Sequence, residues 1–124
     1  MRNEFLHAHQ RLSEAIFILA THPGDVRARL GQVFLAIHMI LEDEIPVSCR
    51  NDWAWTMEQL VRFGPVYDKN RGGAVLIGTI ENTMRRIKNS TGVKIAERFF
   101  KLQEDVEKYY SSPRSEEFGR HELG

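Results

Sequence analysis

The fold is predicted chiefly by residues 74–110, AVLIGTIENTMRRIKNSTGVKIAERFFKLQEDVEKYY. One stripe of mainly apolar side chains recurs along this stretch at steps of three and four residues: Ile77, Ile80, Met84, Ile87, Thr91, Ile95, Phe99, Leu102, Val106 and Tyr109. Such spacing places the stripe on one face of an α-helix, with the charged residues on the other. The pattern predicts a helix of about 37 residues, ~55 Å long at 1.5 Å per residue.

The weakest part of this predicted helix is Asn89–Gly92, NSTG. These residues are poor helix formers and together cost roughly 2–3 kcal/mol relative to alanine. Either the helix continues through them, straight or bent, or it ends near Asn89 and a fifth helix starts at Thr91 or Gly92. We favour continuity, because the apolar stripe crosses this point with only one four-residue step.

Three shorter helices are predicted before this stretch, over residues 3–20, 25–41 and 48–63. Turn signals separate them, namely Thr21–Gly24 (THPG), Pro46 and the pair Gly64-Pro65. Short connections favour antiparallel neighbours, and we find no β-strand pattern of alternating residues. The predicted fold is therefore an all-α, up-down four-helix bundle with a long C-terminal helix. Residues 1–112 form one predicted domain, and residues 113–124 a disordered tail.

The length of the predicted helix implies a partner. The three shorter helices, each ~27 Å long, cover only half of the ~55 Å apolar stripe, which we call the seam. A large exposed apolar patch is rare on a monomer. Trp53 and Trp55 lie about 200° apart around a helix, so Trp55 faces either a partner or a different helix of the same bundle. We expect a homo-oligomer, most simply a dimer. The expected interface, with itself or a second protein, comprises Trp55, Ile95, Phe99, Leu102, Val106 and Tyr109.

Composition narrows the class of protein. The chain has 124 residues, with 17 Lys and Arg against 17 Asp and Glu. A zero net charge gives no whole-chain attraction to nucleic acid. The single cysteine, Cys49, fits a reducing compartment. No apolar run approaches the ~20 residues that span a bilayer, so we expect a cytoplasmic protein that does not enter a membrane.

A local excess of positive charge gives a second hypothesis. Six basic residues lie in the middle of the long segment: Arg85, Arg86, Lys88, Lys94, Arg98 and Lys101. A basic stripe on a helix can follow a phosphate backbone. It can equally be a solvated outer face whose cations pair with acids. The alternative function is therefore a nucleic-acid-binding module using Arg85–Lys101.

No pattern in the sequence indicates catalysis, a metal or a cofactor. His38 and Glu42 have helical ligand spacing but form a single pair, so a hydrogen-bonded histidine is favoured over a metal ligand. Cys49 has no histidine nearby in sequence and is predicted to be a small core residue. We therefore expect a non-enzymatic helical protein that acts through helix-mediated self-association and protein–protein interaction.

A remote alternative comes from the end of the chain. Arg114 and His121 are separated by six residues, a spacing that resembles the Arg-x4–6-His motif of HEPN-type ribonucleases, which are also small helical bundles. The resemblance implies RNA cleavage by these two residues. That family carries the motif on the bundle near its active groove, whereas here it follows Pro113, and the family's other polar contacts are not recognisable.

Overall fold

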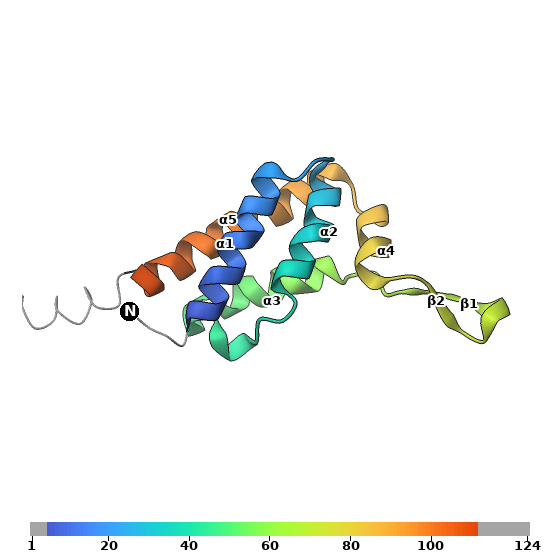
Figure 1. Cartoon of the computed structure of the whole chain (residues 1–124), viewed down its shortest axis with the longest axis horizontal. Coiled ribbons are helices and arrows are strands. Elements are labelled where there is room, and N and C mark those ends of the chain that lie inside the picture. Colours follow the sequence, from blue (N-terminus) through green and yellow to red (C-terminus); the bar gives the residue numbers. More distant parts are fainter. Residues whose placement is uncertain (1–4, 112–124) are drawn as a thin grey trace, which may run out of the picture.

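The computed structural model describes residues 5–111 of the chain. Its elements follow one another in this order: α1 (Leu6–Thr21), α2 (Val26–Ile37), the 3-10 turns η2 (Glu42–Glu44) and η3 (Val47–Cys49), α3 (Arg50–Leu60), β1 (Val66–Asp68), η4 (Lys69–Arg71), β2 (Ala74–Ile77), α4 (Thr79–Arg86) and α5 (Asn89–Ser111). The described part is mostly helical, which confirms the all-α class in outline (Figure 1). The predicted tail, residues 113–124, lies outside the described residues.

The first two helices form the expected antiparallel hairpin. Asp25 caps α2, since its carboxylate accepts a hydrogen bond from the amide of Ala28 at 3.1 Å. Arg29 reaches back across the turn and donates to the carbonyl oxygens of Gly24 and Leu19, both at 3.1 Å. Gly24 has a φ of 98°, a conformation that glycine adopts readily.

The prediction of one helix over residues 74–110 is wrong. The segment contains β2, α4 and α5, and the break between the two helices falls at Ile87 and Lys88, just before the predicted weak point. Ile87 is extended, with φ −80° and ψ 155°. Its side chain is buried, and Nη1 of Arg27 donates to its carbonyl oxygen at 3.2 Å. Tertiary contacts therefore hold a sharp turn of the chain, the corner, at Ile87 and Lys88. The next helix, α5, begins directly after it at Asn89.

Gly92 does not interrupt α5 but permits its packing. A Cβ atom at Gly92 would lie 2.8 Å from Cγ1 of Val26 and 3.7 Å from Cδ1 of Leu30. The start of α5 thus lies against the start of α2 more closely than any side chain would allow. Asn89, Ser90 and Thr91 fall in the first turn of α5, where their low propensity for helix interiors matters least.

The expectation that no strand is present is also wrong. β1 and β2 form an antiparallel hairpin in which Tyr67 lies opposite Val75 and Asp68 opposite Ala74. Gly72 and Gly73 make the turn with φ values of 65° and 82°. Strands of three and four residues are too short to produce a detectable alternation. Figure 1 shows this hairpin projecting from the helical body as an arm.

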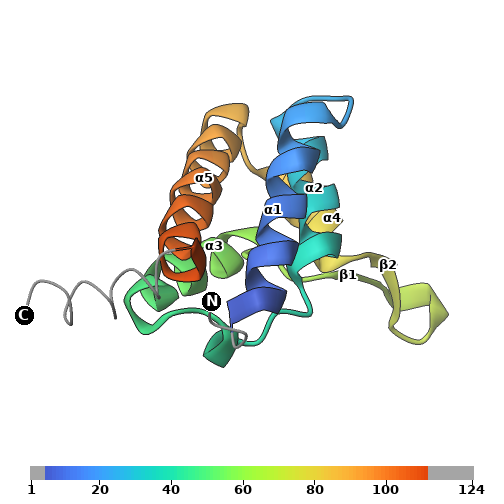
Figure 2. The same cartoon turned by 60° about the vertical axis from the view of Figure 1, so that its left-hand side comes forward.

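The core lies around α5, which packs against α1, α2 and α3 (Figure 2). With 23 residues α5 is ~35 Å long, against ~24 Å for the 16-residue α1. The mismatch in length that implied an uncovered seam is thus much smaller than predicted. The seam residues at the centre of α5 are fully or almost fully buried within the chain: Ile95, Phe99, Leu102 and Val106. No helix among residues 5–111 is long and apolar enough to cross a membrane.

Two glycines make opposite predictions for stability. Gly92→Ala should lower the free energy of unfolding by about 1–3 kcal/mol, because the added methyl group overpacks the contact with Val26. Gly31→Ala, inside α2, should raise it by roughly 0.5–1 kcal/mol, because a methyl group there meets nothing within 4 Å and alanine favours the helix. Urea denaturation of both variants and of the wild type measures these two changes in the free energy of unfolding. A stabilised Gly92→Ala would contradict the close approach of α5 and α2.

Candidate interaction surfaces

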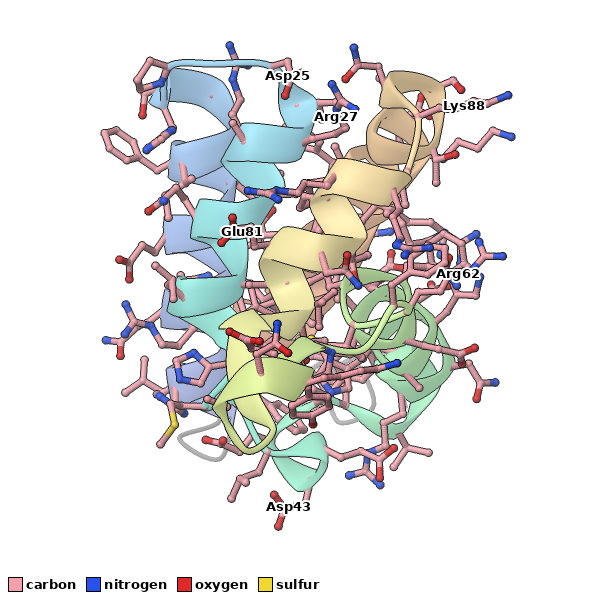
Figure 3. All side chains as sticks on the ribbon, turned by 90° about the vertical axis from the view of Figure 1, so that its right-hand side faces the viewer. Asp25, Arg27, Asp43, Arg62, Glu81 and Lys88 are labelled. Atoms are coloured by element: carbon pink, nitrogen blue, oxygen red, sulfur yellow. The ribbon has the colours of Figure 1, made fainter. Side chains whose placement is uncertain are left out.

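An open groove of about 600 Å³ runs between α2 and α4. Its uncharged lining residues are Ala28, Gly31, Gln32 and Leu35 on α2 and Ile80 and Met84 on α4. Figure 3 views the end of the molecule on which the hairpin arm projects, with Asp25 just before α2, Arg27 in its first turn and Glu81 of α4 labelled. Leu35 stays 60% exposed, so the groove presents apolar surface to solvent.

The charged residues that line the groove are paired with one another. Arg85 donates to Glu81 at 2.8 Å along α4, and Arg27 donates to Asp25 at 3.0 Å at the start of α2. The hydrogen bond from the Ala28 amide and the neighbouring Arg27 guanidinium lower the pKa of the Asp25 carboxyl. The groove thus has an apolar floor and a rim whose charges cancel.

Polar contacts fix α4 as one wall of this groove. Oγ1 of Thr83, which is fully buried, accepts a hydrogen bond from the amide of Phe63 at 3.0 Å. Nδ2 of Asn82 donates to the carbonyl oxygen of Gly64 at 2.7 Å. These bonds tie one side of α4 to the chain that follows α3, while the groove opens on the side facing α2.

No contact among residues 5–111 requires a glycine at position 31. It lies in the middle of α2, where glycine costs about 1 kcal/mol relative to alanine. Unlike at Gly92, a Cβ atom added at Gly31 would meet nothing within 4 Å in the described part of the chain. A glycine on the floor of a groove allows another molecule's backbone or side chain to approach the helix.

The hairpin arm exposes a second apolar surface. Tyr67 is 56% exposed and Val75, directly opposite it on the other strand, is 59% exposed. Because residues opposite each other lie on the same face of a hairpin, the two side chains form one apolar pair. An isolated two-stranded hairpin is marginally stable in water, so this arm would gain from being covered.

The predicted interface residues do not form one exposed surface. Four of them, Ile95, Phe99, Leu102 and Val106, are core residues of the chain. The hydroxyl of Tyr109 lies 2.7 Å from Oγ of Ser48. Trp55 is partly buried beneath the guanidinium of Arg98, which lies 4.3 Å from the centroid of the indole. These residues therefore cannot form the exposed association surface that was predicted from them. Self-association itself stays a prediction.

The basic stretch is divided between α4, the corner after it and α5, and three of its six cations, Arg85, Arg98 and Lys101, pair with acids. On α5, Arg98 donates to Asp52 at 3.0 Å, and Lys101 donates to Asp52 at 2.8 Å and to Asp105 at 3.1 Å. The hydrogen bond from Lys101, followed by the charges of Lys101 and Arg98, lowers the pKa of the Asp52 carboxyl. In turn, the carboxylates of Asp52 and Asp105 raise the pKa of Lys101.

The α4 half of the stretch points elsewhere. Arg85 lies in the groove rim, and Arg86 lies over the ring of Phe63 with its guanidinium carbon 5.2 Å from the centroid. Lys88, at the corner, and Lys94, on α5, are exposed. A hollow of about 290 Å³ beside Trp55 is lined by Lys94, Glu97, Arg98 and Lys101.

The remaining candidate residues have structural contacts. His38 is exposed at the end of α2, stacks on Phe34 and lies 3.1 Å from the carbonyl oxygen of Leu35. Cys49 is a buried core residue, and burial raises the pKa of its thiol, so it is a poor nucleophile. Across residues 5–111 no three His, Cys, Asp or Glu side chains gather as metal ligands would. Arg114 and His121 lie outside the described residues.

Comparison with protein-family models, with curated proteins and with solved structures finds no significant match to this chain. The surfaces above are therefore the basis for a functional proposal.

Sequence reasoning missed both the groove and the arm. The groove joins α2 to α4, elements some fifty residues apart, and periodicity does not show which helices become neighbours. Two local signals were present. Gly31 interrupts a run of residues that otherwise favour a helix. The pair Gly72-Gly73, between short apolar runs, is typical of a hairpin turn.

The ion pairs of Asp52 predict a pH-dependent stability difference. Because its pKa is lowered below its ordinary value of 3.8, the stabilisation is fully present above that pH and is lost as pH falls through the lowered pKa. Asp52→Asn should therefore cost about 0.5–1 kcal/mol at pH 7, the range for partly exposed pairs. The difference from wild type should shrink as the pH is lowered below 3.8 and the Asp52 carboxyl becomes protonated.

Urea denaturation at pH 7 and at acid pH measures this effect. Asp43→Asn, at an exposed carboxyl on η2 with no described ion pair, is the matched control and should change little at either pH. A deficit in Asp52→Asn that is equally large at both pH values would contradict the role of the charge.

Proposed function

We propose that this protein is a non-enzymatic binding module whose α2–α4 groove docks another polypeptide. The observation that carries the proposal is the groove itself: an apolar floor open to solvent, framed by charges that pair with one another. Exposed apolar surface rimmed by polar residues is typical of protein-interaction sites.

The chemistry of the groove favours a polypeptide over a small substrate. Ligand sites usually add a few convergent polar groups that fix orientation. Here the charged side chains of the lining, such as Arg27 and Arg85, already donate to carboxylates of their own helix or its cap. Leu35 on α2 and Met39, two residues after α2 ends, add exposed apolar side chains at 60% and 66% exposure, as a polypeptide partner would require.

Photo-cross-linking in cells tests the proposal. The amino acid p-benzoylphenylalanine at position 35 should form protein adducts, whereas the same group at position 17, where Phe17 is equally exposed on α1, should form several-fold fewer. The added substitution Gly31→Gln should suppress the adducts at position 35 because its side chain occupies the groove floor. Equal labelling at positions 35 and 17, or adducts insensitive to Gly31→Gln, would contradict the proposal.

A nucleic-acid-binding module is the second candidate. It is supported by the hollow in which the Trp55 indole lies beside Lys94 and Arg98, since aromatic and basic side chains together suit single-stranded nucleic acid. The pairing of Arg98 and Lys101 with Asp52 weakens it. The HEPN-type ribonuclease remains a remote alternative that depends on Arg114 and His121.

A mobility-shift assay at low salt separates this candidate from the first. If the hollow binds RNA or DNA, Lys94→Glu should weaken binding by at least several-fold and reduce its dependence on salt, because one phosphate contact is lost. Lys69→Glu, at an exposed lysine on the hairpin arm, is the control. No retardation of single- or double-stranded RNA or DNA by the wild type removes the candidate.

A further inference from the structure

We infer that the groove is occupied by the hairpin arm of a second copy of this chain, in a reciprocal, two-fold dimer. This inference rests on the proposed function, because it names the polypeptide that the groove docks. Tyr67 and Val75 of one copy would lie over Gly31 and Leu35 of its partner, and the same contact would repeat in the other direction.

The two surfaces have matching chemistry and opposite shape. The arm projects from the helical body and carries an apolar pair, Tyr67 and Val75, that is more than half exposed (Figure 1). The groove has an apolar floor and contains a glycine that packing among the described residues does not require. One molecule therefore presents both halves of a complementary contact, and none of residues 5–111 covers either half.

The placement of the surfaces permits a closed dimer. Arm and groove both lie at the end of the molecule that faces the viewer in Figure 3. A second copy approaching this end meets both at once, and a two-fold axis makes the two contacts identical. β2 has four residues, so the strands extend about 13 Å at ~3.3 Å per residue, enough to cover the floor of a groove formed by two neighbouring helices.

The size and charge of the surface also suit self-association. The arm, residues 66–77, and the ten residues that line the groove amount to 22 per copy, within the roughly 20–30 residues a side of a standard interface. The chain has no net charge, so two copies meet without long-range repulsion. Because the rim charges are already paired within each copy, covering the groove with the apolar pair Tyr67 and Val75 leaves no rim charge without its partner.

Matched double variants test each surface by sedimentation equilibrium at tens of micromolar, where a micromolar Kd gives mostly dimer. Tyr67→Glu/Val75→Lys removes the apolar pair of the arm but retains the hairpin, since opposite charges across a strand pair are favourable. Gly31→Glu/Leu35→Lys blocks the groove with a favourable helical pair. Phe17→Glu/Ala20→Lys, on exposed positions of α1, is the control. None of these variants changes the net charge.

We expect twice the 14.4 kDa chain mass for wild type and control, and an at least tenfold weaker dimer for both the arm variant and the groove variant. A monomeric wild type, or an arm variant that dimerises as well as wild type, would overturn the inference. If the wild type is monomeric while position 35 still cross-links to a different protein, the binding function stands and only the second copy is excluded.

Disulfide trapping between introduced cysteines is a second test of the contact between arm and groove, and it does not rely on variants that disrupt the dimer. Copies carrying Val75→Cys are mixed with isotopically heavy copies carrying Leu35→Cys and oxidised; the native Cys49 is buried. A disulfide between positions 75 and 35 of different copies should form several-fold faster than one between Val75→Cys and Phe17→Cys. Equal rates would overturn the inference.

Discussion

Gly92 lies directly against Val26, and this contact between the starts of α5 and α2 is the constraint on which the remaining structure depends. A side chain at Gly92 would hold the two helices apart. The adjoining hydrogen bond from Arg27 to the Ile87 carbonyl fixes the corner between α4 and α5 at the same place. Two backbone segments some sixty residues apart are thereby held together at one end of the molecule.

This corner decides which surfaces are enclosed and which stay open. With the chain turned at Ile87, α5 packs among α1, α2 and α3, and its apolar face is buried within a single copy. α4 instead lies beside α2 without filling the space between them, which leaves the groove. The residues best placed to meet a partner therefore belong to α2, α4 and the arm. The apolar face of α5 is buried and is not available to a partner.

Charge supports the same division of the surface. Asp52 holds both Arg98 and Lys101, and Glu81 holds Arg85, so much of the basic stretch is engaged within the chain. Such partly exposed pairs contribute little to stability individually. These pairs reduce the free positive charge around Asp52 and Glu81, whereas apolar side chains such as Leu35 and Tyr67 stay exposed to solvent.

The sequence alone determined the helical class, the α1–α2 hairpin, and the face of α5 that is buried, because each follows from apolar spacing and from local signals such as Asp25 and Pro23. It did not determine where residues 74–110 break. The cost of Asn89–Gly92 is about 2–3 kcal/mol, of the same order as burying one or two large side chains, so the choice depends on which neighbours the stripe meets.

Only the tertiary structure decided that the break falls at Ile87, that Gly92 is a packing residue, and that the groove and arm exist. Each of these depends on how segments far apart in the chain pack together, such as Gly92 against Val26, or α2 beside α4 with the groove between them. Local pattern records which side of a helix is apolar, but the identity of its neighbour is set by the packing of the whole chain.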